Sequence, residues 1–253
     1  MYKYDLSIIL PSYRKENWKR VIDSIESSVG EATWELIIVG PNRPEEIASN
    51  VRVIQDFGSP ARCAQLALPR ALGRYITWFS DDGIYLPKTL ENALHTYSEL
   101  GLKSVIIVRY AEGGNIPADS YWKSWTHDDQ RLAGVMKDWK IAPVALMPSN
   151  LIRGYGGWDC SYEHLNMCCH DLVYRMQKDG IILHHSPDIV FTCDHTPHAA
   201  DYKPVKEAYH ENDLEVFNSQ WSKPNDRKII DINNWAEACP VWERRFTYPE
   251  RKF

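Results

Sequence analysis

Two adjacent carboxylates, Asp81 and Asp82, come directly after a short apolar segment at residues 75–79. β-Branched and aromatic residues in that segment favour a strand, and Pro87 followed by Lys88 favours the first turn of a helix. Ligands of open α/β sheets bind outside the carboxyl ends of the strands, so these carboxylates could hold a metal-bound nucleotide. The alternative is a plain Asp-Asp-Gly turn, in which the Asp side chains bond nearby backbone and the glycine takes a positive φ.

Thiols and imidazoles later in the chain raise the possibility of a zinc site. The candidates are Cys160, Cys168, Cys169, His170, Cys193 and His195. Their spacing argues against zinc, because no C-x2-C pair exists and the adjacent Cys168 and Cys169 point to different faces of a helix. We expect the cysteines to act as small buried apolar residues instead.

The elements that must position these side chains alternate between strand-like and helix-like patterns. Strands are predicted at residues 6–10, 34–39, 51–54, 75–79, 104–108 and 142–147, with short strands at 181–183 and 189–192. Helices are predicted at residues 16–29, 62–72 and 86–100, and through Asp171 to Lys178, where Gly180 ends the helix. The alternation favours a mainly parallel sheet covered by helices, so the expected fold class is α/β.

Composition narrows the class of protein further. At 253 residues and 44% hydrophobic, the chain can bury a proper core. Its 29 basic and 34 acidic residues give a net charge of −5, which argues against a nucleic-acid surface. The first ten residues carry too short an apolar run for a signal peptide or a membrane span, so we expect a cytoplasmic protein without a transmembrane segment. The closing sequence RRFTYPERKF could touch a membrane or a neighbouring subunit, and a solvated tail is the alternative.

Three stretches of the chain resemble the inverting family 2 glycosyltransferases of GT-A fold, whose bacterial spore-coat polysaccharide member is the best-known model. The first is SIILPSYRKENWKRVIDSI, from Ser7. The second, which is the most specific, is ARCAQLALPRALGRYITWFSDDGIYLPKTL, from Ala61. The third is GGWDCSYEHLNMCCHDLVYRMQKDG, from Gly156 to Gly180.

The resemblance implies a domain organisation. Residues 1–200 would form a GT-A domain, with a nucleotide-sugar-binding half at 1–110 and an acceptor-binding half at 111–200. Its Rossmann-like, mainly parallel sheet would be flanked by helices, with a small mixed sheet on the acceptor side. Residues 201–253 would be a C-terminal extension that packs on the domain.

For the metal, the resemblance implies that Asp82 binds Mn2+ or Mg2+ while Asp81 contacts the ribose or supports the site. Adjacent carboxylates cannot be separated from sequence, so the two roles could be exchanged. His195 would complete the metal or diphosphate contacts, with His198 in reserve, and an isolated surface histidine is the alternative for both. A divalent cation suits hard oxygen ligands and offsets the charge of a leaving diphosphate.

For the nucleotide, the resemblance points to Pro11, Ser12 and Tyr13 at the end of the first strand. Tyr13 could cover the base and Ser12 could offer a hydroxyl or backbone contact, unless this is an ordinary strand-ending turn. Arg62 is placed to reach the diphosphate, because a guanidinium matches phosphate oxygens in a fork, although a solvated helix residue is the alternative. The family's acid after the second strand is replaced here by Gly40, Pro41 and Asn42, so Asn42 would read the base and the base itself stays open.

For the acceptor side, Asp171 would be the catalytic base that takes the proton of the attacking hydroxyl. It is preceded by His170 where the family has an acid, and the alternative is that Asp171 caps a helix beginning around Leu172. Gly157 would let the backbone pass close to a sugar, with Trp158 stacking nearby or, alternatively, lying in the core. Tyr121, Trp122 and Trp125, in a long and partly helical excursion at residues 110–140, could form a stacking platform or seal a core.

These features lead us to expect a metal-dependent inverting glycosyltransferase that moves a sugar from a nucleoside diphosphate to a hydroxyl of a glycan or related acceptor. One rival is a nucleotidyltransferase that makes sugar nucleotides, although PSYRKENWK lacks the glycines of such a loop. The other rival is a sugar- or nucleotide-binding module without turnover, which the missing acid near Gly40 and the presence of His170 would suit.

Overall fold

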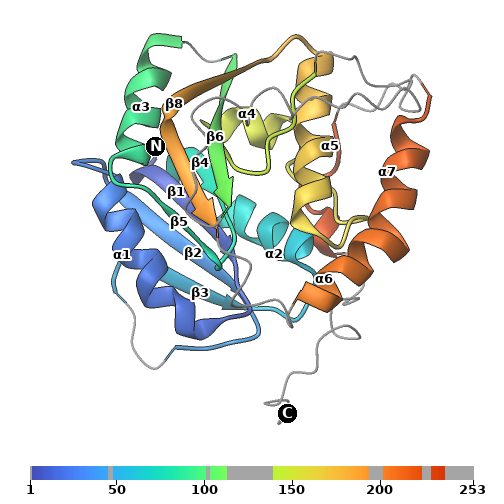
Figure 1. The fold of residues 1–253 in the computed structure, drawn as a ribbon, viewed down its shortest axis with the longest axis horizontal. Helices are drawn as coiled ribbons and strands as arrows, with labels where there is room; N and C mark the ends of the chain where they lie inside the picture. Colours follow the sequence, from blue (N-terminus) through green and yellow to red (C-terminus); the bar gives the residue numbers. More distant parts are fainter. Residues whose placement is uncertain are drawn as a thin grey trace.

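The computed structural model describes residues 2–44, 48–100, 103–112, 139–193, 202–223 and 229–236. Within these ranges the chain forms an α/β fold, with one curled sheet of eight strands and helices on both of its faces (Figure 1). No helix among the described residues is both long enough and apolar enough to span a bilayer.

The sheet is mixed. Its strands are β1 (Tyr4–Pro11), β2 (Trp34–Gly40), β3 (Val51–Gln55), β4 (Gly73–Trp78), β5 (Gly83–Tyr85), β6 (Ser104–Glu112), β7 (Ala145–Pro148) and β8 (Ile182–Cys193). They lie in the order β3-β2-β1-β4-β7-β6-β8-β5. Pairing is parallel from β3 through β4 and again between β6 and β8, whereas β7 and β5 pair antiparallel to their neighbours. The parallel block therefore places the carboxyl ends of β3, β2, β1 and β4 side by side.

Helices cover the two faces of the sheet. They are α1 (Trp18–Ser28), α2 (Pro60–Ala67), α3 (Thr89–Leu100), α4 (Ser149–Gly154), α5 (Leu165–Lys178), α6 (Tyr202–Ala208) and α7 (Leu214–Trp221). Figure 1 shows α1 and α3 together on one side, with α2, α4 and α5 on the other and α6 and α7 outside α5. A π-helical turn (Tyr209–Asp213) joins α6 to α7.

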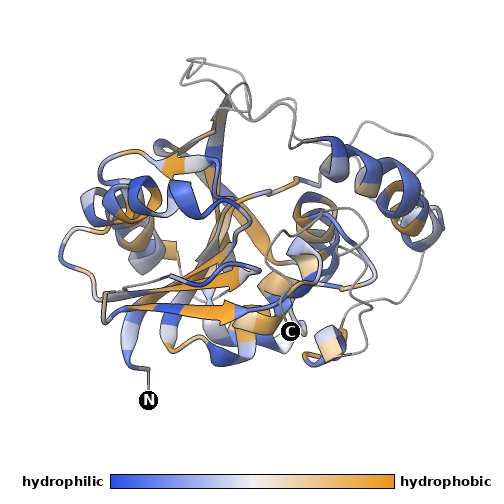
Figure 2. Ribbon diagram, turned by 90° about the horizontal axis from the view of Figure 1, so that it is seen from below, coloured by the Kyte–Doolittle hydropathy of each residue, from blue (hydrophilic) through white to orange (hydrophobic). Residues whose placement is uncertain are grey.

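Two apolar cores result, one on each face. Along β1, Leu6, Ile8 and Leu10 belong to the core under α1 and α3, whereas the alternate residue Ile9 belongs to the core under α2 and α5. Since a strand turns successive side chains to opposite faces, a strand buried on both sides is mostly apolar, as β1 and β2 are. The exceptions are the buried Ser7 and Glu35, and they are hydrogen-bonded to each other. Figure 2 shows the apolar sheet between helices whose outward faces are hydrophilic.

The structure confirms the predicted α/β class and most predicted elements, with informative differences. The short strands predicted at 181–183 and 189–192 are one strand, β8, and β5 was not predicted at all. The helix predicted from residue 86 begins only at Thr89, because Lys88 has a φ of 64°. The helix predicted from residue 62 begins earlier, at Pro60, where the Ser59 side chain accepts a hydrogen bond from the Arg62 backbone.

Gly83 follows the Asp pair and begins β5. Its φ is not positive, so the positive φ that the alternative Asp-Asp-Gly turn required of this glycine is wrong. The reason for a glycine here is space, because a Cβ at this position would lie 1.9 Å from the Phe191 ring, where β5 pairs with β8. The close packing of Phe191 on Gly83 holds the residues after Asp82 against the sheet.

Gly83→Ala should therefore destabilise the fold by about 1–3 kcal/mol, since the ring must move to admit the methyl group. Gly154→Ala is the matched control, because nothing lies within 4 Å of a Cβ there. Urea denaturation should show a change of less than about 0.5 kcal/mol for that control. Equal losses for the two variants would contradict this account of Gly83.

Candidate nucleotide-sugar site

The carboxyl ends of four parallel strands form a row of polar groups. In sheet order they carry Asp56 after β3, residues 40–42 at the end of β2, residues 12–14 after β1, and Asp81 with Asp82 after β4. Most of the residues predicted to bind the donor thus come together at one edge of the sheet. This is the place where open α/β sheets bind ligands.

The Asp81 carboxylate ties the end of β4 to the turn after β1. One oxygen accepts hydrogen bonds from the Ser12 hydroxyl at 2.9 Å, the Tyr13 N–H at 2.8 Å and the Arg14 N–H at 2.7 Å. The other accepts from Arg14 Nε at 2.8 Å and Nη2 at 2.5 Å. Asp81 is only 2% exposed, so this concentration of donors is what allows the charge to be buried.

Asp82 lies beside the same guanidinium. Its Oδ2 is 3.4 Å from Arg14 Nη2, and the residue is 4% exposed. The two adjacent carboxylates therefore differ in their surroundings, which the sequence could not show: Asp81 is a scaffold residue held by the β1 turn, and Asp82 has the longer contact with Arg14. The turn interpretation also holds in part, because Gly83 N donates to Ser80 O at 3.2 Å.

The predicted base-binding residues support this turn. Ser12 donates to Asp81 and accepts from Trp18 Nε1 at 2.6 Å, so both hydrogen-bonding roles of its hydroxyl are used within the protein. Asn42 Nδ2 donates to the Tyr13 carbonyl at 2.6 Å and fixes the end of β2 beside Tyr13. Pro11 is the last residue of β1 and is buried.

The backbone N–H groups of residues 12–14, which form the β1 turn, are all hydrogen-bonded within the protein. Ser12 N donates to Val39 O at 2.9 Å, and the N–H groups of Tyr13 and Arg14 both go to Asp81. A loop that cradles phosphates needs such N–H groups directed at the ligand. A diphosphate at this edge would thus depend on cations rather than on this backbone.

Arg62, predicted to meet a diphosphate, lies at the first turn of α2 next to the end of β3. Its guanidinium forms a fork on Asp56, with Nε at 3.0 Å from Oδ1 and Nη2 at 3.0 Å from Oδ2. It also donates to the Trp235 carbonyl and lies 5.6 Å from the centroid of that ring. In this conformation the guanidinium is engaged by the protein on two sides.

Gly157 and Trp158 form a turn that packs inside the domain. Gly157 has a φ of 78°, and Trp158 is fully buried with its ring edge-on to Trp78 at 5.0 Å. The core alternative for Trp158 is therefore what the structure has, and the ring does not face a sugar site. The buried Gln65 of α2 holds the turn, donating to Gly156 O at 2.7 Å and accepting from Trp158 N at 2.7 Å.

Residues 229–236 lie against the same turn. Gln65 Nε2 also donates to Ile232 O at 2.8 Å, and Asn234 accepts from Cys160 N at 2.8 Å and donates to Trp158 O at 3.0 Å. This short segment from the end of the chain therefore contacts both the turn and α2, where Trp235 meets Arg62.

Asp171, predicted as the base, lies in the middle of α5 and is fully buried. Its Oδ2 accepts from Arg175 Nε at 2.9 Å, and its Oδ1 accepts from Trp221 Nε1 at 3.2 Å. Arg175 is also fully buried and donates to the Tyr155 and Gly157 carbonyls. In this arrangement no acceptor hydroxyl can reach the carboxylate, and the helix-cap alternative is wrong because α5 begins at Leu165.

Several predicted residues lie outside the described part of the chain, namely His195, His198, Tyr121, Trp122 and Trp125. Strand β8 ends at Cys193, which pairs with Gly83 beside the Asp pair. Among the described residues, no three His, Cys, Asp or Glu side chains gather as a metal cluster. A magnesium ion needs only one or two carboxylates together with substrate phosphates, so Asp82 fits as a hard oxygen ligand for a cation that arrives with a diphosphate.

Sequence reasoning missed two residues that organise this region. Arg14 stands within the quoted PSYRKENWK stretch and is the first cation after the β1 turn, which could have singled it out. Gln65 stands in the second stretch, but nothing local distinguishes a buried glutamine of a helix from an exposed one. Its importance rests on partners about 90 and 170 residues away along the chain.

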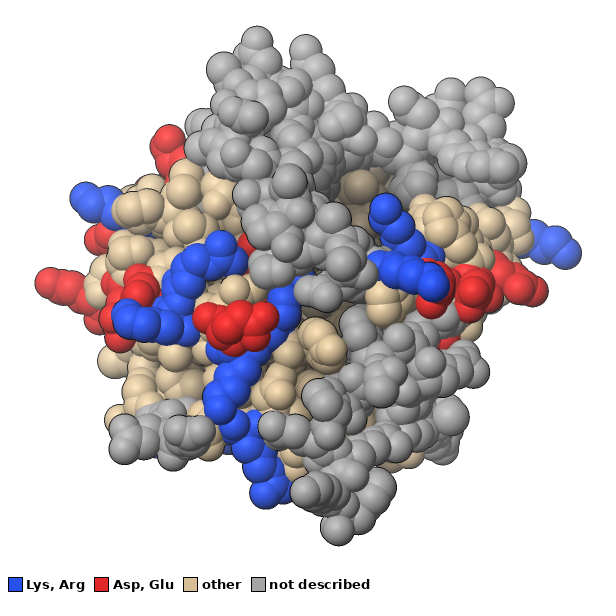
Figure 3. Space-filling model, turned by 60° about the horizontal axis from the view of Figure 1, so that its bottom comes forward, with Lys and Arg blue, Asp and Glu red and all other residues tan. Residues whose placement is uncertain are grey.

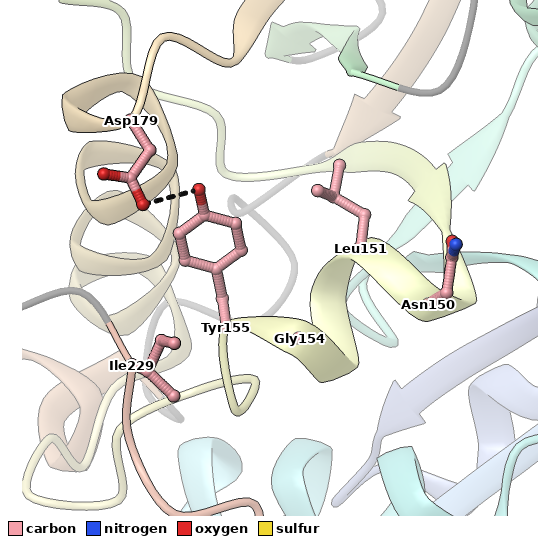
Figure 4. Close-up of a pocket in the computed structure, with 6 residues that line it drawn as sticks. All are labelled: Asn150, Leu151, Gly154, Tyr155, Asp179 and Ile229. Carbon is pink, nitrogen blue, oxygen red and sulfur yellow. Dashed lines mark hydrogen bonds between the residues drawn. The ribbon is translucent and has the colours of Figure 1, made fainter.

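Two features away from this edge can be described, namely the charge of one face and one pocket. Figure 3 shows basic and acidic side chains intermingled over the face it presents, without a broad area of one sign. A pocket of about 360 Å3 is lined by Asn150, Leu151, Gly154, Tyr155, Asp179 and Ile229 (Figure 4). Because Pro148 pairs with Tyr75 near the start of β4, the α4 side of this pocket lies at the opposite edge of the sheet from Asp82. Its one drawn hydrogen bond runs from the Tyr155 hydroxyl to Asp179, at 3.0 Å.

Comparison of the sequence with known proteins finds glycosyltransferases. No family model matches the chain. An uncharacterised glycosyltransferase of Rickettsia prowazekii (strain Madrid E) is 23% identical over 183 residues, covering 65% of this chain and 56% of the relative. A similar protein of Rickettsia typhi (strain ATCC VR-144 / Wilmington) is 24% identical over 178 residues, covering 63% and 55%. The chain thus spans just over half the length of these relatives.

Comparison of the structure with solved structures finds a similar fold in TarS of S. aureus. The crystal structure of S. aureus TarS 1-349 superposes with a TM-score of 0.56 at 14% identity, covering 86% of this chain and 69% of TarS 1-349. Its complex with UDP gives 0.57 at 15% identity with the same coverage, and its complex with UDP-GlcNAc gives 0.52 at 14% identity, covering 75% and 58%. The fold is therefore similar to that of the TarS glycosyltransferase.

The buried pair of Asp171 and Arg175 predicts that Asp171→Asn will destabilise the fold by about 3–5 kcal/mol, because Arg175 is left buried without a counter-charge. The control is Asp23→Asn, which breaks the exposed i,i+4 pair with Lys19 and should cost less than about 0.5 kcal/mol. Chemical denaturation measures both. An Asp171→Asn variant with normal stability and nucleotide binding but no turnover would support the base assignment instead.

Asp213 holds the start of α5 from the neighbouring π-helical turn. Its two oxygens accept from the N–H groups of Glu163 and His164, each at 2.8 Å. Burial, which outweighs these hydrogen bonds, raises the pKa of Asp213 from 3.8 to about 6. The folded protein therefore binds this proton more tightly than the unfolded chain.

Because the folded pKa of Asp213 is raised, its contribution to stability is greatest below about pH 4 and is lost as the pH rises through 6. Asp213→Asn cannot titrate, so its stability relative to the wild type should rise by on the order of 2 kcal/mol between pH 4 and pH 7. Urea denaturation of both proteins across that range tests this. A difference that does not change with pH would contradict the raised pKa.

Proposed function

We propose that this chain is a glycosyltransferase that uses a nucleoside diphosphate sugar and transfers the sugar to a hydroxyl of a glycan or related acceptor. The observation that carries the proposal is the Asp pair at the carboxyl edge of the sheet, locked to the β1 turn by Asp81, on a fold similar to TarS. TarS has been solved with UDP and with UDP-GlcNAc, which supports a nucleotide-sugar donor.

The finer proposal is an inverting, family 2-like transfer supported by Mn2+ or Mg2+. Asp82 would hold the cation, with His195 as a second ligand, and the cation would offset the charge that develops on the departing diphosphate. The β1 turn supports this proposal, because its three consecutive N–H groups are already bonded within the protein. Asp81 contributes by fixing this turn, with Tyr13 and Asn42 beside it, in register with Asp82.

Inverting transfer also needs a base for the acceptor hydroxyl. We do not assign this role to Asp171 in the conformation described, because Arg175 and Trp221 occupy both of its oxygens. For Asp171 to act as the base, α7 would have to move so that Trp221 leaves Oδ1, and the Arg175 side chain, which belongs to α5 itself, would have to turn away from Oδ2.

The nucleotidyltransferase rival is disfavoured by the same β1 turn. Such an enzyme must bind a nucleoside triphosphate, and a phosphate-binding loop does so with backbone N–H groups. Here the N–H groups of residues 12–14 are bonded to Val39 and Asp81. The binding-module rival keeps the same contacts and differs only in turnover, so hydrolysis of the donor separates it from an enzyme.

Asp82→Asn tests the proposal. It should abolish the stabilisation that a nucleoside diphosphate with Mn2+ gives in thermal denaturation, and should lower slow hydrolysis of UDP-sugars about 100-fold or more. Asp23→Asn, which removes an exposed carboxylate, should behave as the wild type in both assays. Unchanged hydrolysis in Asp82→Asn would sink the proposed role of this residue, and pyrophosphate release from a nucleoside triphosphate would favour the rival enzyme.

A further inference from the structure

Arg14 forms ion pairs with both carboxylates of the Asp pair. Its Nη2 lies 2.5 Å from Asp81 Oδ1 and 3.4 Å from Asp82 Oδ2, while its Nε donates to Asp81 Oδ1 at 2.8 Å. The side chain is itself largely buried, with 13% exposure. The guanidinium therefore occupies space beside Asp82 that a metal ion bound there would also approach.

The balance of charge explains why Arg14 lies there. Two carboxylates, 2% and 4% exposed, are adjacent in the chain, and burying both as anions is costly unless cations compensate them. Asp81 is surrounded by donors from residues 12–14, one of which is the guanidinium itself. The guanidinium of Arg14 thus contacts both negative charges, with the shorter contacts on Asp81.

A divalent cation at Asp82 would meet this guanidinium at close range, and the two positive charges would repel each other. A nucleoside diphosphate changes the balance, because its phosphate oxygens bring enough negative charge for both cations. Arg14 Nη2 can then turn from Asp82 toward a phosphate oxygen, while Nε keeps its hydrogen bond to Asp81. Arg62 cannot take this part as it lies, because Asp56 and the Trp235 carbonyl hold it.

We propose that Arg14 is a displaceable counter-cation of the Asp pair, so that a divalent cation binds Asp82 tightly only together with a nucleoside diphosphate. This inference rests on the proposed function, because it concerns the metal ligand assigned there. The inference also describes how binding would proceed. Without nucleotide, Arg14 offsets the charge of the Asp pair, and the metal and the donor then bind cooperatively.

The test is calorimetric titration with Mn2+ in the absence of nucleotide. Arg14→Gln should bind Mn2+ at least about tenfold more tightly than the wild type, because the competing charge is gone. Lys15→Gln is the matched control: it removes the same charge from the exposed neighbouring residue and should titrate as the wild type does. Arg14→Lys keeps the charge without the fork and should fall between the two.

UDP, with GDP as a second probe, tests the cooperativity. In the wild type either nucleotide should raise the affinity for Mn2+ at least about tenfold, and in Arg14→Gln this gain should shrink. Arg14→Gln should also melt at a lower temperature than the wild type and recover more of that loss on addition of Mn2+. The double variant Arg14→Gln with Asp82→Asn should lose the tight Mn2+ binding, which places the ion at Asp82.

The outcomes separate this inference from the proposed function. Equal Mn2+ affinity in the wild type and Arg14→Gln would overturn the role of Arg14, even where UDP-sugar hydrolysis by the wild type is intact. Tight Mn2+ binding by Arg14→Gln, abolished by Asp82→Asn, would support the inference even if no sugar nucleotide were hydrolysed, in which case the proposed transferase would fall. Tight Mn2+ binding that survives Asp82→Asn would overturn the inference.

Discussion

The candidate site depends on one buried carboxylate, Asp81, which joins two strand ends that are 67 to 69 residues apart in sequence. Parallel pairing of β1 and β4 brings the two ends to the same edge, but it does not fix the loops that follow them. Asp81 fixes those loops by accepting two backbone N–H groups, a hydroxyl and a guanidinium. Everything else proposed for this edge, including the position of Asp82, follows from that cross-link.

The cross-link also sets the electrostatic character of the edge. Backbone N–H groups that could have bound an anion are used to stabilise a buried anion of the protein itself. The turn at residues 12–14 therefore lacks the preformed phosphate cradle of a glycine-rich loop, and the proposed diphosphate would contact side chains or a metal cation there instead. A helix N-terminus binds an anion with backbone N–H groups, whereas this turn would leave the diphosphate to a small number of cations. The positions of those cations would then determine how the diphosphate binds.

Local patterns were enough to predict β1 to β4 and the α/β class, whereas the family resemblance was needed to bring Ser12, Tyr13, Asn42 and the Asp pair together in one site. Local patterns failed where the answer depends on distant partners. For Asp171 the sequence left a base or a helix cap open; its ion pair with Arg175 is local, but its burial depends on α7, where Trp221 lies 50 residues further along the chain. Strand β5 has three residues and exists because β8 pairs with it, so no periodicity could reveal it.

The amide of Gln65 has a practical consequence. It bonds the Gly156 turn and Ile232 at once, so residues 229–236 complete hydrogen bonds that begin inside the domain. A version of the protein shortened before residue 229 would leave a buried amide short of an acceptor and would uncover the Arg62 guanidinium that Trp235 now covers. Shortened versions made for crystallisation would thus lose residues that cover buried groups of the domain. Such versions should keep the chain at least to residue 236.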